Sequence, residues 1–410
     1  MSASAQNNLT MFNFITLWFG AAISVAEILA GGLLAPLGFM LGIGAVLLGH
    51  LVGTTILICG GIIGTEARIP AMVSTRISFG QYGSYLFSAL NVLQLLGWTA
   101  VMIISGARSV NQITKILWSF DHLTVWILVI GAFIFAWVWL GKDSGWKKAN
   151  HFAVILLFFL TVILSLNVFS NPELFSKQGA GDLAFGPAVE LVVVMPLSWL
   201  PLIADYTRFA KSKRAGAWGS WLGYFAGSSW MYIVGLGTAI LANDPDPSAL
   251  LLAANLGIVA LGIVVLSTVT TTFLDAYSAG VTFLNIFPQL NEKKVALAMT
   301  AIGTGLAIVV PIEQYQNFLY AIGSVFAPLF AILLTDYFFL KNKKVADNLL
   351  LNWGALVICV AGTVLYYQFI KFSFVLGATI PVMLITGVLY TVSRRLTERW
   401  KLSKKQPQTC

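Results

Sequence analysis

Residues 14–38 read FITLWFGAAISVAEILAGGLLAPLG, a run of apolar, small and hydroxyl residues with one charge, Glu27. As a helix, this run is long enough to cross the roughly 30 Å of hydrocarbon in a bilayer. A carboxyl at mid-span costs at least about 2.5 to 3.5 kcal/mol on insertion scales, so a ligand, a proton or a water-filled cavity normally compensates it. Glu27 is therefore the first functional candidate. The alternative is a protonated or hydrogen-bonded carboxyl packed between helices.

The composition defines the class of protein. Hydrophobic residues make up 58% of the 410 residues and charged residues 10%, which indicates a polytopic membrane protein. We predict twelve membrane helices, centred at about residues 25, 52, 95, 132, 160, 196, 229, 267, 304, 327, 360 and 383. The polar joints between them are short and contain no Walker-type phosphate loop, which argues against an ATP-driven pump.

The positive charges predict the orientation. The net charge of +8 does not indicate a nucleic-acid partner, because Lys and Arg alternate with the predicted spans. With the N-terminus inside, all but four of the 24 basic residues fall on cytoplasmic segments. We therefore expect a multi-pass protein of the inner (plasma) membrane with both termini cytoplasmic and a basic tail next to anionic lipid. No obligate protein partner is evident. The four basic residues outside the predicted cytoplasmic segments are Arg108, Lys115, Lys177 and Lys371.

Two predicted spans are interrupted at corresponding places. The first contains Gly20-Ala-Ala-Ile-Ser24-Val-Ala-Glu27, and the sixth contains Met195-Pro196-Leu-Ser198-Trp199-Leu-Pro201. They stand five spans apart, as equivalent broken helices do in inverted-repeat transporters, where the freed backbone groups face a cavity at the midplane. Ser24 is placed among the predicted substrate contacts with Glu27. The alternative is ordinary proline kinking, which membrane helices tolerate.

The third span offers an aromatic platform. Gln94 and Trp98 are spaced i and i+4 and share one helix face. A flat heteroaromatic ring stacked on Trp98 would gain about 1 to 3 kcal/mol by analogy with base stacking, and Gln94 would read a ring edge. Trp199 is the candidate for the opposing face. The alternative for each tryptophan is packing.

The eighth span is rich in hydroxyl groups. Ser267, Thr270 and Thr271 belong to a run that also contains two further threonines, and oxygen ligands of this kind suit sodium. Carbonyls of the interrupted first span would complete the site. The alternative is back-bonding of each hydroxyl to its own helix or bonding between helices. Asp275, one turn later, is a further candidate for a gate or hydrogen-bonding role.

Three motifs in order resemble the nucleobase cation symport family one, which includes cytosine, uracil, allantoin and hydantoin permeases. They are Arg76-Ile-Ser78-Phe79-Gly80-Gln-Tyr-Gly83-Ser84, then Ala204-Asp205-Tyr206-Thr207-Arg208-Phe209, and Pro328 to Asp336-Tyr337. The resemblance covers essentially the whole chain. It implies one integral membrane domain over 1–410, all-α, with a ten-helix inverted-repeat core of the leucine-transporter type and two extra C-terminal helices. The repeats are 12–170 and 183–340, the peripheral helices 350–394 and the tail 395–410.

The resemblance also implies roles for residues. Trp98 matches the family's stacking residue and Ser198 a substrate-contacting position, while Gln94 stands one place from the cytosine-permease glutamine. The family's sodium-binding hydroxyls fall on Thr270 and Thr271. The remaining implied sodium ligands are the carbonyls of Gly20, Ile23 and Ser267.

The chain departs from the cytosine permease at three places. Pro196 replaces a phenylalanine of the sixth span, Ser267 replaces an asparagine that reads the base, and Glu27 has no counterpart. A carboxylate facing a protonated ring nitrogen and an exocyclic amine holds an aminopyrimidine bidentately. The chain accordingly resembles the branch described as hydroxymethylpyrimidine transporters.

This resemblance implies a sodium-driven symporter for 4-amino-5-hydroxymethyl-2-methylpyrimidine, a thiamine precursor, which is the hypothesis we adopt. The runner-up is a sodium- or proton-coupled permease for cytosine or another nucleobase or hydantoin. Two other classes stay open. A passive channel explains a polar cavity but not paired broken helices, and a membrane enzyme lacks any metal-ligand or nucleophile pattern here. His50 is interpreted as a packing histidine, and we expect Asp205 to pair with Arg208.

Overall fold

The computed structural model describes residues 9–141, 144–177, 179–242, 257–309, 314–345, 348–372 and 374–405. Residues 406–410 of the predicted tail lie outside this set. Within it the regular structure is helical, and Leu9 and Ala210 form an isolated parallel β-bridge. The helices are α1 (Met11–Ala22), α2 (Val25–Gly32), η2 (Ala35–Leu37), α3 (Phe39–Ala67), α4 (Ala71–Ser74), α5 (Arg76–Trp118), α6 (Leu123–Leu140), α7 (Ser144–Phe169), α8 (Glu173–Ser176), α9 (Phe185–Ser198), α10 (Leu200–Thr207), α11 (Lys213–Ala242), α13 (Gly257–Leu284), α14 (Glu292–Val309), α15 (Tyr315–Leu334), η4 (Thr335–Phe339), α16 (Trp353–Phe369) and α17 (Thr379–Lys405).

Among the described residues, six helical segments are long and apolar enough to cross a membrane, and the bent pair α1–α2 makes a seventh. The other five predicted windows, centred near residues 160, 267, 304, 360 and 383, fall within α7, α13, α14, α16 and α17. The chain is therefore an all-helical, multi-pass membrane protein. Twelve crossings remain a prediction.

The first predicted interruption is confirmed. α1 ends at Ala22 and α2 begins at Val25, with a bend of 58° between the two parts. Ser24 has extended backbone angles, and its Oγ accepts a hydrogen bond from the Glu27 N–H at 3.3 Å. A serine that caps a helix in this way restarts it and satisfies a free N–H group. Ser24 thereby places Glu27 in the first turn of α2, where the helix dipole favours a carboxylate.

The second predicted interruption is also confirmed. α9 ends at Ser198 and α10 begins at Leu200, with Trp199 between them. Pro196 lies within the last turn of α9, and proline removes a backbone donor and disfavours continuation of a helix. Gln94 on α5 donates from Nε2 to the Ser198 carbonyl at 2.8 Å. This side chain satisfies a carbonyl that the break frees in a buried place.

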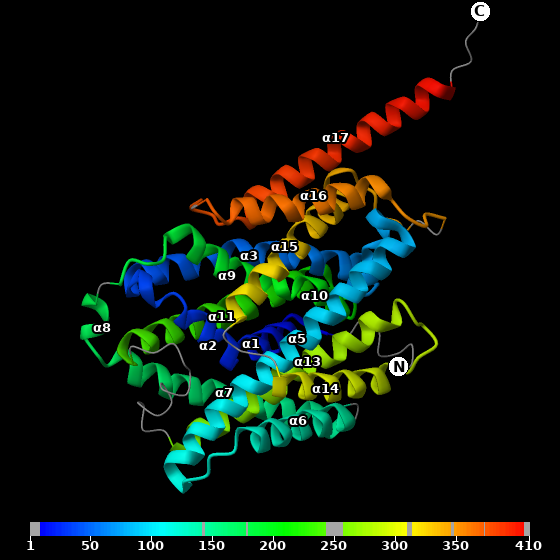
Figure 1. The fold of residues 1–410 in the computed structure, drawn as a ribbon. Coiled ribbons are helices and arrows are strands. Elements are labelled where there is room, and N and C mark those ends of the chain that lie inside the picture. Colours follow the sequence, from blue (N-terminus) through cyan, green and yellow to red (C-terminus); the bar gives the residue numbers. More distant parts are fainter. Residues whose placement is uncertain are drawn as a thin grey trace, which may run out of the picture.

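Each broken pair packs on one long helix. α1 and α2 lie along α11, and α9 and α10 lie along α3 (Figure 1). A Cβ atom at Gly235 on α11 would stand 2.1 Å from the carbonyl oxygen of Ile28, and one at Gly53 on α3 would stand 2.8 Å from that of Val193. Only glycine permits backbones to approach this closely. Helices α2 and α9 are thus each held at backbone contact with a partner from the other part of the chain.

Basic loops gather at one end of the bundle. Leu9 pairs with Ala210 there, and the Glu66 carboxylate forms ion pairs with Lys213 at 2.7 Å and Lys343 at 2.8 Å. These segments were all predicted to be cytoplasmic. The contacts bring the predicted inner loops together, as a common membrane side requires.

The last two helices are attached to the bundle through a buried acid. α16 and α17 lie along its outside, in orange and red in Figure 1, and pack on α15 and on each other. Glu190 on α9 accepts hydrogen bonds from the Tyr366 hydroxyl at 2.6 Å and from Thr379, at 2.6 Å from Oγ1 and 2.8 Å from the amide. Glu190 therefore links the second broken helix to the C-terminal pair.

The predicted pairing of Asp205 with Arg208 is present as a main-chain contact. The Asp205 carboxyl accepts from the backbone N–H of Ala71 at 3.0 Å, while Arg208 donates from Nε to the main-chain carbonyl of Asp205 at 3.1 Å. The N–H of Ala71 is free to serve because this residue begins the short helix α4, whose first amides have no partner in the helix.

Candidate functional site

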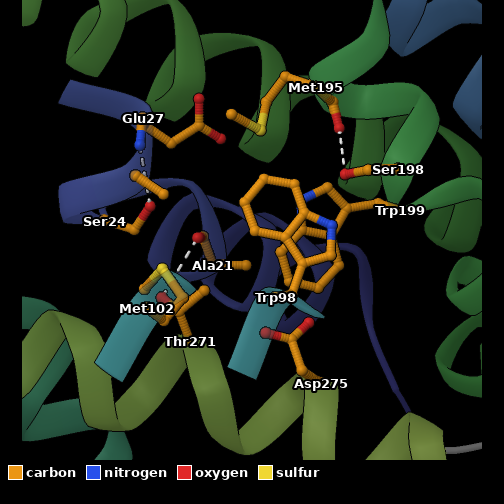
Figure 2. Close-up of a pocket in the computed structure, with 11 residues that line it drawn as sticks. Ala21, Ser24, Glu27, Trp98, Met102, Met195, Ser198, Trp199, Thr271 and Asp275 are labelled. Carbon is orange, nitrogen blue, oxygen red and sulfur yellow. Dashed lines mark hydrogen bonds between the residues drawn. The ribbon is translucent and has the colours of Figure 1, made fainter. Parts of the chain in front are cut away.

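The two helix breaks face a small cavity in the middle of the bundle (Figure 2). Five of the six predicted substrate residues line it: Ser24 and Glu27 from the first break, Trp98 from α5, and Ser198 and Trp199 from the second break. In the view of Figure 2, Glu27 and Asp275 lie at opposite ends of the labelled set, with the two indoles between them. The breaks therefore bring residues about 170 positions apart onto one site.

Gln94, the sixth predicted contact, does not line the cavity. Its amide braces the Ser198 carbonyl, and its Oε1 is buried without a hydrogen-bond partner in the described part of the chain. In this structure Gln94 shapes the second break from behind. A direct contact between Gln94 and a substrate stays a prediction.

Hydroxyl groups of α11 hold the Glu27 carboxyl. Tyr224 donates to its Oε1 at 2.9 Å, and Ser228 lies 2.7 Å from its Oε2. Glu27 itself is 2% exposed, and both hydroxyl residues are fully buried. Each carboxyl oxygen has a second lone pair, so two hydrogen bonds leave capacity for a ligand. The predicted functional acid thus lies on the cavity and is oriented by its neighbours.

His50 is buried and packs edge-on against Tyr232, as interpreted from the sequence, and it also makes polar contacts. Its Nε2 lies 2.5 Å from Ser228 Oγ, and its Nδ1 lies 3.1 Å from the carbonyl oxygen of Val46. His50 therefore belongs to the polar cluster of Glu27. Tyr224 and Ser228 were also missed, although their i and i+4 spacing places two hydroxyls on one face of an apolar span.

Aromatic residues support both indoles of the cavity. Trp98 packs edge-on against Phe318 at 5.3 Å and Tyr315 at 6.0 Å between ring centroids, and Trp199 packs edge-on against Trp18 at 5.6 Å. Such pairs favour fixed ring positions. The open volume of the cavity is about 20 Å³, which is room for about one water molecule. A planar ligand therefore requires the lining side chains to move apart.

One predicted sodium ligand contacts the first break. Thr271 on α13 donates from Oγ1 to the carbonyl of Ala21 at 3.3 Å, between the predicted ligands Gly20 and Ile23 in sequence. The hydroxyls of Thr270 and Ser267 instead donate to carbonyls of their own helix, at 2.8 and 3.1 Å. Hydroxyl and carbonyl oxygens are the donors that a monovalent cation uses at an unwound helix. Of the five predicted ligands, Thr271 thus contacts the first break, and coordination of sodium by the five stays a prediction.

Asp275 adds a second carboxyl to the cavity, on the same helix as Thr271. It is 3% exposed and lines the cavity with Glu27. Ionisable side chains inside a membrane bundle usually mark a substrate or ion pathway. The sequence indicated a gate or hydrogen-bonding role near the end of the span, whereas the structure places this carboxyl on the cavity.

A helical membrane protein with two broken helices around a polar and aromatic cavity has the architecture of a secondary transporter. The chain belongs to the family described as "Permease for cytosine/purines, uracil, thiamine, allantoin", whose profile matches residues 3–392. It is similar to the putative purine-cytosine permease YxlA of Bacillus subtilis, with 26% identity over 88% of this chain and 84% of that one. It is also similar to the cytosine permease of Escherichia coli K12, with 25% identity over 94% of this chain and 93% of that one.

Solved structures show the same fold. Mhp1, a nucleobase-cation-symport-1 family transporter solved closed with bromovinylhydantoin bound, matches with a TM-score of 0.80 and 20% identity over 98% of this chain and 94% of that one. Its inward-facing conformation matches with a TM-score of 0.78 and 19% identity over 96% and 92%. The family resemblance is therefore confirmed, and the chain is a permease and not an enzyme.

Proposed function

We propose that this permease imports 4-amino-5-hydroxymethyl-2-methylpyrimidine, or a close aminopyrimidine, together with sodium by alternating access. The observation that carries the proposal is that Glu27 and the two indoles, those of Trp98 and Trp199, line one cavity. A flat ring suits the indoles, and a carboxyl suits a ring edge with a nitrogen and an amine. Thiamine stands in the family description, which fits a precursor of that vitamin.

The indoles would provide stacking and the carboxyl would provide direction. Stacking on Trp98 contributes about 1 to 3 kcal/mol by analogy with base stacking. Glu27 accepts the amine hydrogen with one oxygen and shares one proton with the ring nitrogen through the other, so the ring and the carboxyl hold that proton jointly. Ser24 and Ser198 lie on the same cavity and offer hydroxyls to ring substituents.

The runner-up substrate is cytosine or another nucleobase or hydantoin. Relatives named cytosine permease and hydantoin permease favour it, the latter from Microbacterium maritypicum with 23% identity over 83% of this chain. Cytosine also presents a ring nitrogen beside an amine, so Glu27 accommodates either edge. The substituents on the rest of the ring therefore decide between the two candidates.

Sodium would act at the contact between Thr271 and the first break. A cation there binds carbonyls of Gly20, Ile23 and Ser267 with the hydroxyls of Thr270 and Thr271, and so fixes the unwound segment that ends at Ser24. Ser24 caps the helix that carries Glu27, so cation binding preorganises the substrate site. A proton on Glu27 or Asp275 is the alternative coupling ion.

The whole chain would form one inverted-repeat transporter. We propose repeats over 12–170 and 183–340, peripheral helices over 350–394, twelve crossings in the inner (plasma) membrane and both termini in the cytoplasm. The reciprocal packing of α1–α2 on α11 and α9–α10 on α3 supports the repeats, because α3 and α11 are the second spans of the two halves. Rocking of the broken pairs against the rest of the bundle then opens the site to each side of the membrane in turn.

The test is binding to purified protein with and without sodium. The hydroxymethyl aminopyrimidine and cytosine are titrated into wild type and Glu27→Gln. Glu190→Gln is the matched control, because Glu190 is an equally buried glutamate on a membrane helix and bonds to Tyr366 and Thr379 away from the cavity. We expect tight, sodium-enhanced binding of the aminopyrimidine that Glu27→Gln abolishes and Glu190→Gln preserves.

Two other results carry a clear meaning. Preference for cytosine promotes the runner-up. Equal binding by wild type and Glu27→Gln removes Glu27 from recognition and leaves it a structural or proton-coupling role.

A further inference from the structure

Behind the cavity, three buried side chains form a continuous polar chain. Glu27 Oε2 on α2 lies 2.7 Å from Ser228 Oγ on α11, which lies 2.5 Å from His50 Nε2 on α3. Their exposed fractions are 2%, 0% and 0%. Two ionisable groups are thus joined by one hydroxyl inside the bundle, and only Glu27 faces the cavity.

The backbone fixes the hydrogen on one side of the imidazole. His50 Nδ1 lies 3.1 Å from the carbonyl oxygen of Val46, and a carbonyl only accepts hydrogen bonds. Nδ1 must therefore carry a hydrogen. Whether Nε2 also carries a hydrogen then sets the charge of the ring, because a histidine with hydrogens on both nitrogens is a cation.

The three linked side chains need one proton more than a carboxylate, a hydroxyl and a neutral imidazole carry. Ser228 has a single hydroxyl hydrogen but two neighbours, Glu27 and His50, at hydrogen-bond distance. If Ser228 donates to His50, Glu27 must be protonated to donate to Ser228. If Ser228 donates to Glu27, His50 Nε2 must carry a hydrogen and donate to Ser228. Without the extra proton, one of these two buried contacts sets acceptor against acceptor, which is costly at this depth.

We propose that Glu27, Ser228 and His50 are a proton relay that keeps one exchangeable proton next to the substrate site. In the transfer, the O–H bond at Glu27 Oε2 breaks as Ser228 Oγ takes that proton, and Ser228 passes its own hydrogen to His50 Nε2. The net change is one proton moved from Glu27 to His50. No bond between heavy atoms changes, and no electrons are transferred.

The relay gives Glu27 two chemical characters. Protonated, it donates its one hydrogen to Ser228 and offers only neutral acceptors to the cavity, which match the amine of a ring. Ionised, it offers two acceptors, which match a ring whose nitrogen is itself protonated. His50 is in this view a positioning residue that acts through Ser228 and selects the form of Glu27. This consequence for recognition rests on the proposed function, whereas the relay itself does not.

Few other ionisable groups face the relay. On α11, the Tyr224 hydroxyl donates to Glu27 Oε1, so it satisfies the oxygen that the relay does not use. The ring of Tyr232 packs edge-on against His50 at 4.8 Å between centroids. Across the cavity, α13 contributes Asp275, and on α15 the Tyr315 hydroxyl donates to the carbonyl of Ala26. Helices α5 and α9 contribute Trp98 and Met195 to the cavity, and neither side chain carries a charge.

Histidine-selective nitrogen-15 NMR tests the relay without any substrate. The chain has three histidines, and His50→Gln assigns the signal of His50. In wild type we expect the Nε2 shift of His50 to lie between the values for a bare and a protonated nitrogen. In Glu27→Gln, whose amide has no proton to give up, we expect the value for a bare nitrogen at every pH at which the protein is folded.

Serine variants separate the relay from general packing. Ser228→Ala removes the bridging hydroxyl, so the His50 signal should lose its dependence on residue 27 in a Ser228→Ala, Glu27→Gln double variant. Ser229→Ala is the matched control, because the neighbouring Ser229 is buried but its hydroxyl makes no hydrogen bond among the described residues. It should leave the His50 signal as in wild type. Identical His50 shifts in wild type, Glu27→Gln and Ser228→Ala would overturn the relay.

Adding the aminopyrimidine links the relay to recognition. Binding of the ring with its nitrogen protonated should keep Glu27 ionised, so the relay proton moves to His50 and the His50 signal moves towards the value for a protonated nitrogen. Because the ring binds with one proton, Kd should rise about tenfold per pH unit above the pH at which the free ring loses that proton. If the NMR signature holds while substrate binding ignores Glu27→Gln, the relay stands and the proposed function fails. If binding needs Glu27 but His50 never responds, the proposed function stands and the relay fails.

Discussion

Tyr224 supplies one of the two hydroxyl contacts of the Glu27 carboxyl. In Tyr224→Phe the carboxyl loses this donor while it stays buried, which costs about 1 to 3 kcal/mol. We expect a lower Tm of the detergent-solubilised protein and weaker substrate binding. Tyr232→Phe is the control on the same helix, because the Tyr232 hydroxyl makes only a 3.4 Å contact with the Leu191 carbonyl. Equal losses in both variants would assign the effect to α11 in general.

Thr271 is the hydroxyl through which α13 contacts the first break. We expect Thr271→Ala to weaken the sodium dependence of transport before it affects folding, because one oxygen ligand is lost while the helix is kept. Sodium titrations of uptake measure this effect. Thr300→Ala on α14 is the control, since Thr300 is buried but bonds only to its own helix at Ala296. Unchanged sodium dependence in Thr271→Ala would contradict the assignment of the cation site.

The sequence predicted the residues of the cavity better than their supports. Glu27 stood out because a charge at mid-span is costly, and Trp98 and Trp199 because indoles flank polar positions there. Tyr224 and Ser228 gave a weaker signal, because spacing shows which residues share a helix face but not which helix that face meets. The polar contacts of His50 gave no signal in the sequence for the same reason. The partner of His50 is 178 residues away and is set by tertiary packing.

At the scale of elements, the contact between α2 and α11 is the tightest constraint on the first broken helix. Gly235→Ala places a methyl group against the Ile28 carbonyl, so the two backbones must separate. Overpacking of this kind typically costs about 1 to 3 kcal/mol. We expect lower Tm and loss of transport. Gly305→Ala on α14 is the matched control, because no atom lies within 4 Å of its added Cβ, and it should keep both properties. A Gly235→Ala protein with normal Tm would show that α2 shifts without penalty.

Helix breaks were predictable and helix partners were not. A serine cap at Ser24 and prolines at Pro196 and Pro201 are local features, and local features determine where a helix stops. The choice of α11 and α3 as partners depends on which glycines meet which backbone, and the chain is rich in glycine throughout. The hydrogen bond from Gln94 to the second break was likewise not predictable, because spacing shows the helix face of Gln94 but not the depth of the cavity.

For the whole molecule, the coupling of sodium and substrate has a testable symmetry. If sodium raises the affinity for the aminopyrimidine by some factor, the substrate must raise the affinity for sodium by the same factor. Couplings between two sites are typically about 5- to 150-fold. We expect equal factors when the Kd of each ligand is measured at low and at saturating concentrations of the other. No sodium effect in either direction would favour the proton as coupling ion.

Hydropathy predicted where the long apolar helices lie, whereas the number of membrane crossings stays a prediction. All twelve predicted windows fall on helices, yet α14 falls short of a simple span because Glu292, Lys293 and Lys294 open this 18-residue helix. Buried hydroxyls and acids are compatible with a membrane only where other helices cover them. Composition alone cannot show that cover, because it arises from neighbours far away in the sequence.

Each broken pair packs on a helix of the other half of the chain, and this has a consequence for how the protein is synthesised. α1 and α2 have their packing partner, α11, in the second half, and α9 and α10 have theirs, α3, in the first. Neither half contains the main packing partner of its own broken helix. A gene cut between α8 and α9 should therefore yield two fragments that are degraded when expressed singly and that accumulate and restore uptake when co-expressed. During synthesis, α1 and α2 are made before α11, so we expect their packing to be completed only after α11 is inserted.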